Sequence, residues 1–293
     1  MEKKKVLFII NPVSGITKHK FWVDLAIKAL HETYDFQVCH TKYAGHGNVL
    51  AKEAVAAGTD IVVAVGGDGT VNEVASALVG TSTRLSIFPM GSGNGLAREL
   101  GINTKLSHKS IVALKHDQPK KVDYGLAMGQ PFFCTCGTGF DAEIARRIAG
   151  SKVRGFISYA YLCAKALFSY KPVTVTYSVE GGETVTRPVF VINAANIKQF
   201  GFGAQIAPLA SVQDGMLDVT IVPPINFFQA LKLGIGMFTH TFHKMTPVET
   251  FKCTEITVTI PDDAPFHIDG DYIKRTENTF TIKVIPGGIN ILV

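Results

Sequence analysis

The stretch that most constrains this chain is residues 61–74, which read IVVAVGGDGTVNEV. It opens with an unbroken, mostly β-branched apolar run, which favours a strand covered on both faces, as in a parallel sheet flanked by helices. The glycines at 66–69 can adopt positive φ and let a ligand approach the main chain, and Thr70 can cap a helix that opens at Val71. Strand, glycine turn and helix in this order predict a phosphate-binding site, because N–H groups at a helix start point outward together.

The acidic residue inside this turn, Asp68, indicates which phosphate ligand to expect. A carboxylate would repel a bare phosphate. Its presence is explained if a divalent cation lies between the carboxylate and the phosphate oxygens. The turn therefore predicts binding of a nucleotide together with Mg²⁺.

Two further turns of small residues also follow apolar runs that read as strands. Residues 85–90 (LSIFPM) lead into GSGNG at 91–95, and the strand at 6–10 ends in NPVSG at 11–15. The carboxyl ends of parallel strands share one edge of a sheet, and ligands bind in the crevice there. We therefore expect the three turns to line one edge.

These turns and three later segments resemble the diacylglycerol kinase catalytic-domain family, which includes bacterial lipid kinases, sphingosine kinases and ceramide kinases. The resemblance spans nearly the whole chain. GGDGT alone is shared with NAD kinases and resembles phosphofructokinases, so the specificity comes from the full set in this order. The segments are NPVSG at 11–15, GGDGTVNEV at 66–74, PMGSGNGLARELG at 89–101, FCTCGTGFD at 133–141, GFGAQIAPLASVQDGMLD at 201–218 and IDGD at 268–271.

The resemblance implies a kinase that uses ATP and Mg²⁺ to phosphorylate a lipid hydroxyl, with Asp68 ordering the metal. In the segment 41–47, Thr41 and the Gly-His-Gly that follows resemble a nucleotide-side element of the family. The implied nucleotide-binding residues are Asn11, Pro12, Ser14, Gly15, Thr41, Gly66, Gly67, Asp68, Gly69, Thr70, Asn72, Glu73, Gly91, Ser92, Gly93 and Asn94.

The catalytic base is expected in the late Asp-Gly-Asp sequence. Asp269 and Asp271 flank a glycine among apolar neighbours, a setting that can raise a carboxyl pKa toward neutrality. In the family this element commonly ends in glutamate, which is assigned as the general base. The matching residue is Asp271, one methylene shorter, and Asp269 is the alternative.

A structural Mg²⁺ is implied at a second place. Residues 211–218 (SVQDGMLD) resemble the segment that holds this ion in bacterial members of the family. Asp214 would supply a carboxylate, and Ser211 and Met216 would offer main-chain carbonyls. A plain Asp-Gly turn between strands explains the same residues equally well.

The resemblance leaves two candidates for the lipid acceptor, diacylglycerol and a sphingoid base. Bacterial diacylglycerol kinases usually carry an aspartate where this chain has Gly95, and the sequence GSGN is closer to sphingosine-type members. Two helices rich in aromatic residues, near 155–169 and 226–238, are candidates for an apolar lipid slot. Alternatives are an NAD kinase-like phosphotransferase and a non-catalytic lipid- or nucleotide-binding regulator.

The expected fold is an α/β amino-terminal domain with an open parallel sheet, NAD kinase- and phosphofructokinase-like, plus an antiparallel β-sandwich-like carboxy-terminal domain. Up to about residue 125 the pattern alternates strand and helix. Residues 126–280 contain runs rich in Thr, Val and Phe, including 132–135 and 184–194, and Gly-Gly at 181–182 predicts a hairpin. The resemblance implies that 281–293 return to the first domain.

The composition of the chain indicates its core size, its location and the partners it can have. The chain has 293 residues, 46% of them hydrophobic, which suffices for sizeable cores, and no run approaches the length of a membrane span. Its five cysteines are odd in number and scattered, which favours reduced thiols. The apolar run at 6–10 is too short for a signal peptide and is ended by Asn11-Pro12, so a cytoplasmic location is expected. A net charge of +5 with local basic clusters is compatible with peripheral contact with anionic membranes, whereas nucleic-acid binding has no motif to support it. The oligomeric state is not decided, and a dimer stays open.

Overall fold

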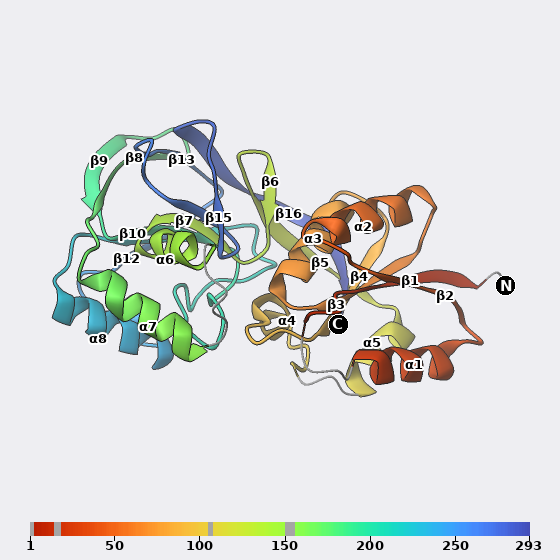
Figure 1. Cartoon of the computed structure of the whole chain (residues 1–293). Coiled ribbons are helices and arrows are strands. Elements are labelled where there is room, and N and C mark those ends of the chain that lie inside the picture. Colours follow the sequence, from red (N-terminus) through yellow and green to blue (C-terminus); the bar gives the residue numbers. More distant parts are fainter. Residues whose placement is uncertain (1–2, 15–18, 105–107, 150–155) are drawn as a thin grey trace. The chain divides into compact units, whose positions relative to one another are not determined.

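The structure, a computed structural model, describes residues 3–14, 19–104, 108–149 and 156–293 (Figure 1). It divides into two compact units, one made of Met1–Asp123 with Gly287–Val293 and the other of Tyr124–Pro286. The chain passes between them within β5 (Pro119–Ala127) and again within β16 (Thr279–Leu292). The last residues of the chain therefore belong to the first unit.

A parallel sheet in the order β2–β1–β3–β4 forms the centre of the first unit. The end of β16 extends this sheet beside β4. Every residue of β3 is buried, as expected of a strand with both faces covered. The four strands are β1 (Lys4–Ile10), β2 (Tyr34–His40), β3 (Ile61–Gly66) and β4 (Arg84–Pro89).

Helices cover both faces of this sheet (Figure 1). On one face, Val6, Phe8 and Ile10 of β1 share a core with residues of two helices, because alternate side chains of a strand point to the same side. The helices on that face are α1 (His19–Leu30) and α5 (His108–His116), and those on the other are α2 (His46–Ala56) and α3 (Asp68–Leu78). The short α4 (Gly95–Glu99) follows β4.

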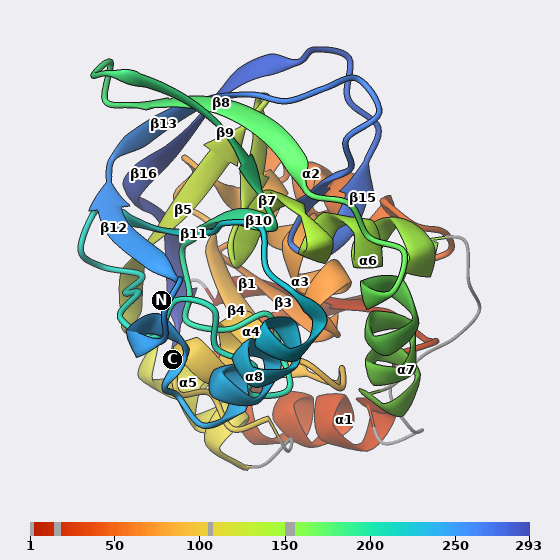
Figure 2. The ribbon, with the colours of Figure 1, turned by 90° about the vertical axis from the view of Figure 1, so that its left-hand side faces the viewer.

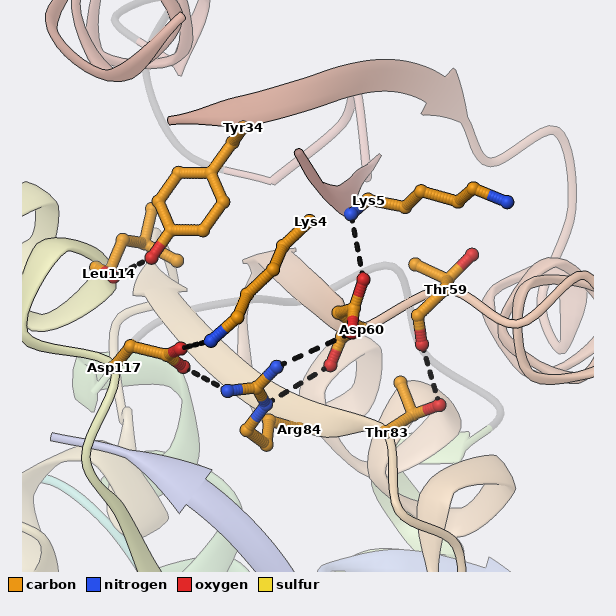
Figure 3. Close-up of polar contacts among 9 residues, drawn as sticks. All are labelled: Lys4, Lys5, Tyr34, Thr59, Asp60, Thr83, Arg84, Leu114 and Asp117. Atoms are coloured by element: carbon orange, nitrogen blue, oxygen red, sulfur yellow. Dashed lines mark hydrogen bonds and ion pairs between the residues drawn. The ribbon is translucent and has the colours of Figure 1, made fainter. Parts of the chain in front are cut away.

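Charged side chains join the strands at their amino ends (Figure 3). Asp117 forms ion pairs with both Lys4 and Arg84, the first residues of β1 and β4. Arg84 also donates to the main-chain carbonyl of Asp60 at 3.3 Å, and Asp60 accepts the N–H of Lys5 at 2.8 Å. These contacts stabilise the amino-terminal edge of the sheet, whereas the predicted ligand site lies at the carboxyl edge.

The second unit is a sandwich of antiparallel sheets that share one core. Inward residues of both sheets meet there, including Val175 and Ile256 from one sheet and Ile192 and Val219 from the other. One sheet has the order β12–β11–β10–β7–β14–β15, with β7 (Thr135–Gly139), β10 (Val191–Ala195), β11 (Leu217–Val222), β12 (Glu249–Cys253), β14 (Phe266–Ile268) and β15 (Asp271–Ile273). The other joins the first part of β16 to β13 (Glu255–Thr259), β8 (Val173–Val179) and β9 (Thr184–Val189), with β5 and β6 (Gln130–Phe132) beside them.

The predicted fold class is confirmed, but several element boundaries differ from those expected. The run at 184–194 is broken at Phe190 into β9 and β10, which belong to different sheets. The strand expected over 132–135 is interrupted, because β6 ends at Phe132 and β7 begins at Thr135. Between them, the N–H groups of Phe133 and Cys134 donate to the Asp269 side chain instead of to a neighbouring strand. The hairpin at 181–182 is confirmed between β8 and β9.

Four helical segments are described in the second unit. Both aromatic-rich helices are found as expected, whereas α6 was not predicted from the sequence, because its short stretch FDAEIARRIA lies within a motif that was interpreted as part of a site. The segments are α6 (Phe140–Ala149), α7 (Phe156–Leu167), α8 (Phe227–Phe238) and the single 3₁₀ turn η1 (Phe242–Lys244).

Candidate active site

Four turns gather at the carboxyl ends of β1 to β4, all within the first unit. The strands are parallel neighbours, so their ends meet at one edge, and main-chain hydrogen bonds tie the turns together there. The N–H of Asn11 donates to Val65 at 3.0 Å, that of Thr41 to Ile10 at 2.9 Å, and that of Met90 to Gly66 at 2.8 Å. The expected convergence of the glycine turns is therefore observed.

The turn after β1 is bound to the helix that follows β3. The side-chain amide of Asn11 donates to the hydroxyl of Thr70 at 3.0 Å. Thr70 is buried, inside the first turn of α3 and close to Gly66. It does not cap a helix that opens at Val71, as the sequence suggested, because α3 already begins at Asp68 after Gly67.

The glycines of these turns are required mainly for close packing. None of the three at 66, 67 and 69 has positive φ, contrary to the expectation. A Cβ on Gly91 would lie 2.6 Å from the Cα of Gly67, so the two turns touch through their main chains. A Cβ on Gly69 would meet nothing within 4 Å, which leaves space in front of the helix start.

Asp68 connects the turns after β3 and β4. Its two carboxylate oxygens accept the N–H groups of Asn94 at 2.8 Å and of Gly95 at 2.6 Å. Burial raises the pKa of Asp68, and these N–H groups and Arg98 lower it only in part. Asp68 therefore has a supporting role that the sequence interpretation did not include.

Glu73 connects the turn after β2 to α3 in the same way. Its carboxylate accepts the N–H of Gly45 at 2.7 Å and that of Gly47 at 2.9 Å. The side chain of Asn48 donates to the main-chain carbonyl of Glu73 at 3.0 Å. Glu73 thus fixes the 45–47 segment beside α3.

The first unit fits a nucleotide phosphate at the start of α3. N–H groups in the first turn of a helix have no partner within the helix, and the space beside Gly69 leaves them accessible. The Asp68 carboxylate has about four acceptor sites, more than its main-chain donors use, which fits a Mg²⁺ that keeps its water shell. Among the other predicted residues, Pro12 and Ser92 are exposed, Ser14 and Asn72 are partly buried, Gly93 and Asn94 are buried, and Gly15 lies outside the described residues.

The Asp-Gly-Asp turn belongs to the second unit and joins β14 to β15. Asp271 is exposed, so the apolar surroundings expected for it are not found. Asp269 has φ 50° and accepts the N–H groups of Phe133, Cys134 and Thr135 at 2.8, 2.7 and 3.0 Å. Asp269 therefore holds the main chain before β7, and Asp271 is the carboxylate that this turn presents at its surface.

A buried polar network supports this turn, and the sequence interpretation missed it. His267, only 2% exposed, accepts the N–H of Gly270 at its Nδ1 at 3.3 Å and contacts Asp141 Oδ2 through its Nε2 at 3.1 Å. Asn193 donates to the same oxygen at 2.9 Å. A neutral His267 protonated on Nε2 satisfies both contacts. The three side chains lie 52 to 126 residues apart, so no local spacing reveals them.

The predicted structural metal site does not fit a divalent ion as the structure places it. The Lys252 ammonium contacts Asp214 at 2.7 Å, Asp218 at 2.8 Å and the carbonyl of Leu209 at 3.2 Å. Burial lowers the pKa of Lys252, but its hydrogen bonds to the two carboxylates outweigh this, and the net pKa is raised. A cation therefore already lies on the Asp214 carboxylate, the one side-chain ligand that the metal would need. Ser211 accepts the N–H of Gln213 at 3.3 Å, and the N–H of Met216 donates to the Asp214 side chain at 3.2 Å.

Both halves of the chain match known domain families. Residues 5–127 match the diacylglycerol kinase catalytic domain, and residues 134–293 match the YegS C-terminal NAD kinase beta sandwich-like domain. A diacylglycerol kinase of Mycobacterium tuberculosis is 28% identical, covering 98% of this chain and 94% of its own. A probable lipid kinase YegS-like of Chromohalobacter salexigens is 30% identical over 84% of this chain and 79% of its own.

Solved structures show the same fold. A diacylglycerol kinase from Bacillus anthracis has a TM-score of 0.76 at 21% identity and covers 100% of this chain and 97% of its own. An NAD kinase from Archaeoglobus fulgidus in complex with ATP has a TM-score of 0.57 at 14% identity, over 99% and 93% of the two chains. Within the described part of this chain, no helix has the length and apolar character needed to cross a bilayer.

Proposed function

The chain belongs to the diacylglycerol kinase catalytic-domain family of lipid kinases, and on this premise we propose that it transfers the γ-phosphate of ATP to a lipid hydroxyl. The observation that carries the proposal is the set of four turns at the carboxyl edge of the first unit. Asn11, Asp68 and Glu73 tie these turns to one another around the start of α3. Such an edge binds phosphate through main-chain N–H groups and the positive end of the helix.

In this proposal the turns at 11–14, 67–70 and 91–94 hold the triphosphate. Asp68 would hold a hydrated Mg²⁺, and the ion would neutralise charge on the phosphate oxygens. The buried position of Asp68 favours this role, because burial strengthens its attraction to a cation. The residues of the 211–216 segment take no part in metal binding.

Asp271 is proposed as the general base. It would accept the proton of the lipid hydroxyl as the hydroxyl oxygen attacks the γ-phosphorus and ADP leaves. Asp269 is unsuited to this role, because its oxygens already accept three main-chain N–H groups. In this proposal, the Asp271 carboxylate takes part in proton transfer, and the Asp269 carboxylate holds the main chain in position.

The proposed acceptor is a diacylglycerol or a sphingoid base presented at a cytoplasmic membrane surface. The names of the relatives favour diacylglycerol, whereas Gly95 in place of the usual aspartate favours a sphingoid base. The fold shared with an NAD kinase gives NAD as a second candidate acceptor.

A transfer assay with ATP labelled in its γ-phosphate tests the proposal. The acceptors should include diacylglycerol, monoacylglycerol, sphingosine, dihydrosphingosine, ceramide, phosphatidylglycerol and NAD. We expect label in one lipid class, dependent on Mg²⁺. Label in NAD alone would assign the second candidate, and tight lipid binding without any transfer would identify a non-catalytic regulator.

A further inference from the structure

The outer side of α8 carries apolar side chains that the core of the second unit does not use. The helix begins with a capping box formed by Asn226 and Gln229, so its first turn is well defined. Its inner side is already packed, because Ala230, Leu233 and Gly236 are buried. The outer side chains are therefore additional to those that hold the helix in place.

These outer residues form a continuous stripe. Phe228 is 78% exposed, Leu231 52%, Ile235 59% and Phe238 45%. Spacings of three and four residues place them on one side of the helix. A helix that is apolar all round is normally buried, and an exposed apolar stripe of this size marks an interaction surface.

The end of α7 extends the stripe. Phe168 is 78% exposed, and its ring stacks on that of Phe227 with centroids 4.9 Å apart. Phe168 directly follows α7, and Tyr161, which lies within the helix, is 67% exposed. Figures 1 and 2 show α7 and α8 on the same side of the second unit. We call this set the outer helical face, defined by Tyr161, Phe168, Phe228, Leu231, Ile235 and Phe238.

The charged side chains of the two segments that carry the outer helical face have one sign. The sequences 156–171 and 226–244 contain no Asp or Glu. Their lysines, Lys165, Lys171, Lys232 and Lys244, are exposed. Apolar side chains beside lysines suit the boundary between acyl chains and anionic headgroups, because the lysine stems lie on apolar surface while the ammonium groups reach phosphate.

We propose that the outer helical face docks this protein on a bilayer that contains anionic lipid, with Phe228, Leu231 and Ile235 inserted at the level of the headgroups. The inference rests on the proposed function in one respect, since a lipid acceptor reaches the enzyme from a bilayer. A symmetric pairing of two copies through this face is disfavoured, because the two segments that carry it have lysines and no acidic side chain, so neither copy would offer a carboxylate to the lysines of the other.

Vesicle sedimentation without ATP tests the proposal. The variant Phe228→Ser/Leu231→Ser/Ile235→Ser removes three exposed side chains, so its melting temperature should match that of the wild type. The matched control, Phe21→Ser/Leu209→Ser/Val112→Ser, removes exposed side chains of similar type elsewhere. Vesicles of phosphatidylcholine, with and without phosphatidylglycerol, serve as the surface.

We expect the wild type and the control to bind the mixed vesicles and the α8 variant to bind at least about tenfold more weakly. Lys232→Gln should weaken binding about fivefold, and only to the anionic vesicles. Equal binding by the α8 variant and the control would overturn the proposal. So would a wild-type dimer, seen by sedimentation velocity, that the α8 substitutions convert to monomer.

A fluorescence measurement covers the case in which the triple variant fails to fold. Phe228→Trp in a Trp22→Phe background leaves one tryptophan in the chain, because the wild type has only one. Its emission should shift to the blue on anionic vesicles, and an unchanged spectrum would contradict insertion.

Activity on a short-chain acceptor dissolved without vesicles separates this inference from the proposed function. The α8 variant should phosphorylate it as the wild type does, because Phe228, Leu231 and Ile235 lie on the exposed outer side of α8. An enclosed lipid slot of the kind first expected at this helix would use its packed inner side, which the variant leaves unchanged. Vesicle binding that depends on the outer helical face, without transfer to any acceptor, would refute the kinase proposal and leave the docking face standing.

Discussion

The turns of the first unit and the Asp-Gly-Asp turn of the second both depend on one carboxylate that accepts main-chain N–H groups. Asp68 joins its own turn to donors that lie 26 and 27 residues away in the turn after β4, and strand order already brings those two turns together. Asp269 instead binds donors more than 130 residues away. Its neighbour His267 depends on Asp141, 126 residues away.

This difference shows that an acidic residue in a recognisable motif can hold the main chain in place, and that its chemical role cannot be assigned from the motif alone. Asp68 and Asp269 both hold main chain in place, although sequence reasoning proposed each for chemistry. Asp68 has burial and remaining acceptor capacity that suit a cation. Asp269 is committed to three donors, which leaves the exposed Asp271 as the candidate for proton transfer.

The largest expected effect separates the two carboxylates of the late turn. Asp271→Asn should lower kcat by about 10² to 10⁴. Its melting temperature should stay close to that of the wild type, because the residue is exposed. Asp269→Asn should instead lower the melting temperature, because an amide has one acceptor oxygen where the structure uses two. Exposed Asp263→Asn is the control, and a fully active Asp271→Asn would make the base assignment wrong.

The next comparison is between alanine substitutions at two glycines of the first unit, which should differ in their effect on stability. Gly91→Ala should lower the free energy of unfolding by about 1–3 kcal/mol, because its Cβ would meet the main chain of Gly67. Gly69→Ala should change stability by less than about 0.5 kcal/mol, because its Cβ enters open space. It should nevertheless weaken ATP binding, measured by calorimetry. Unchanged ATP affinity in Gly69→Ala would argue against a phosphate at the start of α3.

Substitutions of His267, which belongs to the buried network of the second unit, should lower activity by a smaller factor, on the order of tenfold. His267→Asn can keep an acceptor for the N–H of Gly270, and His267→Gln can keep a donor to Asp141. If the network positions the turn, the Asn variant should retain more activity, with kcat reduced and KM for ATP unchanged. Equal losses in both variants, matched by equal losses of melting temperature, would indicate a general packing role.

The raised pKa of Asp68 predicts that the stability of the first unit depends on pH. An acid whose pKa rises on folding binds its proton more tightly in the folded state, so its ionisation weakens the fold. This contribution should be fully present below the ordinary pKa of 3.8 and lost as pH rises through the raised value. Thermal unfolding of Asp68→Asn should lack this component. An identical pH profile in the variant would contradict the burial argument.

The smallest expected effect concerns the 211–216 segment. With Lys252 on Asp214 and Asp218, chelation by EDTA should leave the melting temperature of the ATP-free protein unchanged. The control, Lys252→Met, should be destabilised by about 1 kcal/mol, since these pairs are partly exposed. A wild-type melting temperature that falls with EDTA and returns with Mg²⁺ would restore the metal site.

Sequence reasoning predicted the sheet of the first unit and the meeting of its turns, because each turn follows an apolar run directly and parallel strands share their carboxyl edge. It did not predict the packing role of Gly67 and Gly91, which depends on turns being in contact. It also missed Asn193 and His267, because their interactions with Asp141 join separate elements of the sandwich. Local sequence patterns predict strands and turns, whereas polar contacts between distant residues depend on how the elements pack in three dimensions.

The most direct test of the account is a crystal structure of the wild type with Mg²⁺ and a non-hydrolysable ATP analogue. The account predicts phosphate oxygens within hydrogen-bonding distance of N–H groups in 67–70 and 91–94, and a hydrated Mg²⁺ whose water contacts Asp68. A nucleotide bound away from the carboxyl edge of the first unit, or a triphosphate with no contact to these turns, would contradict it.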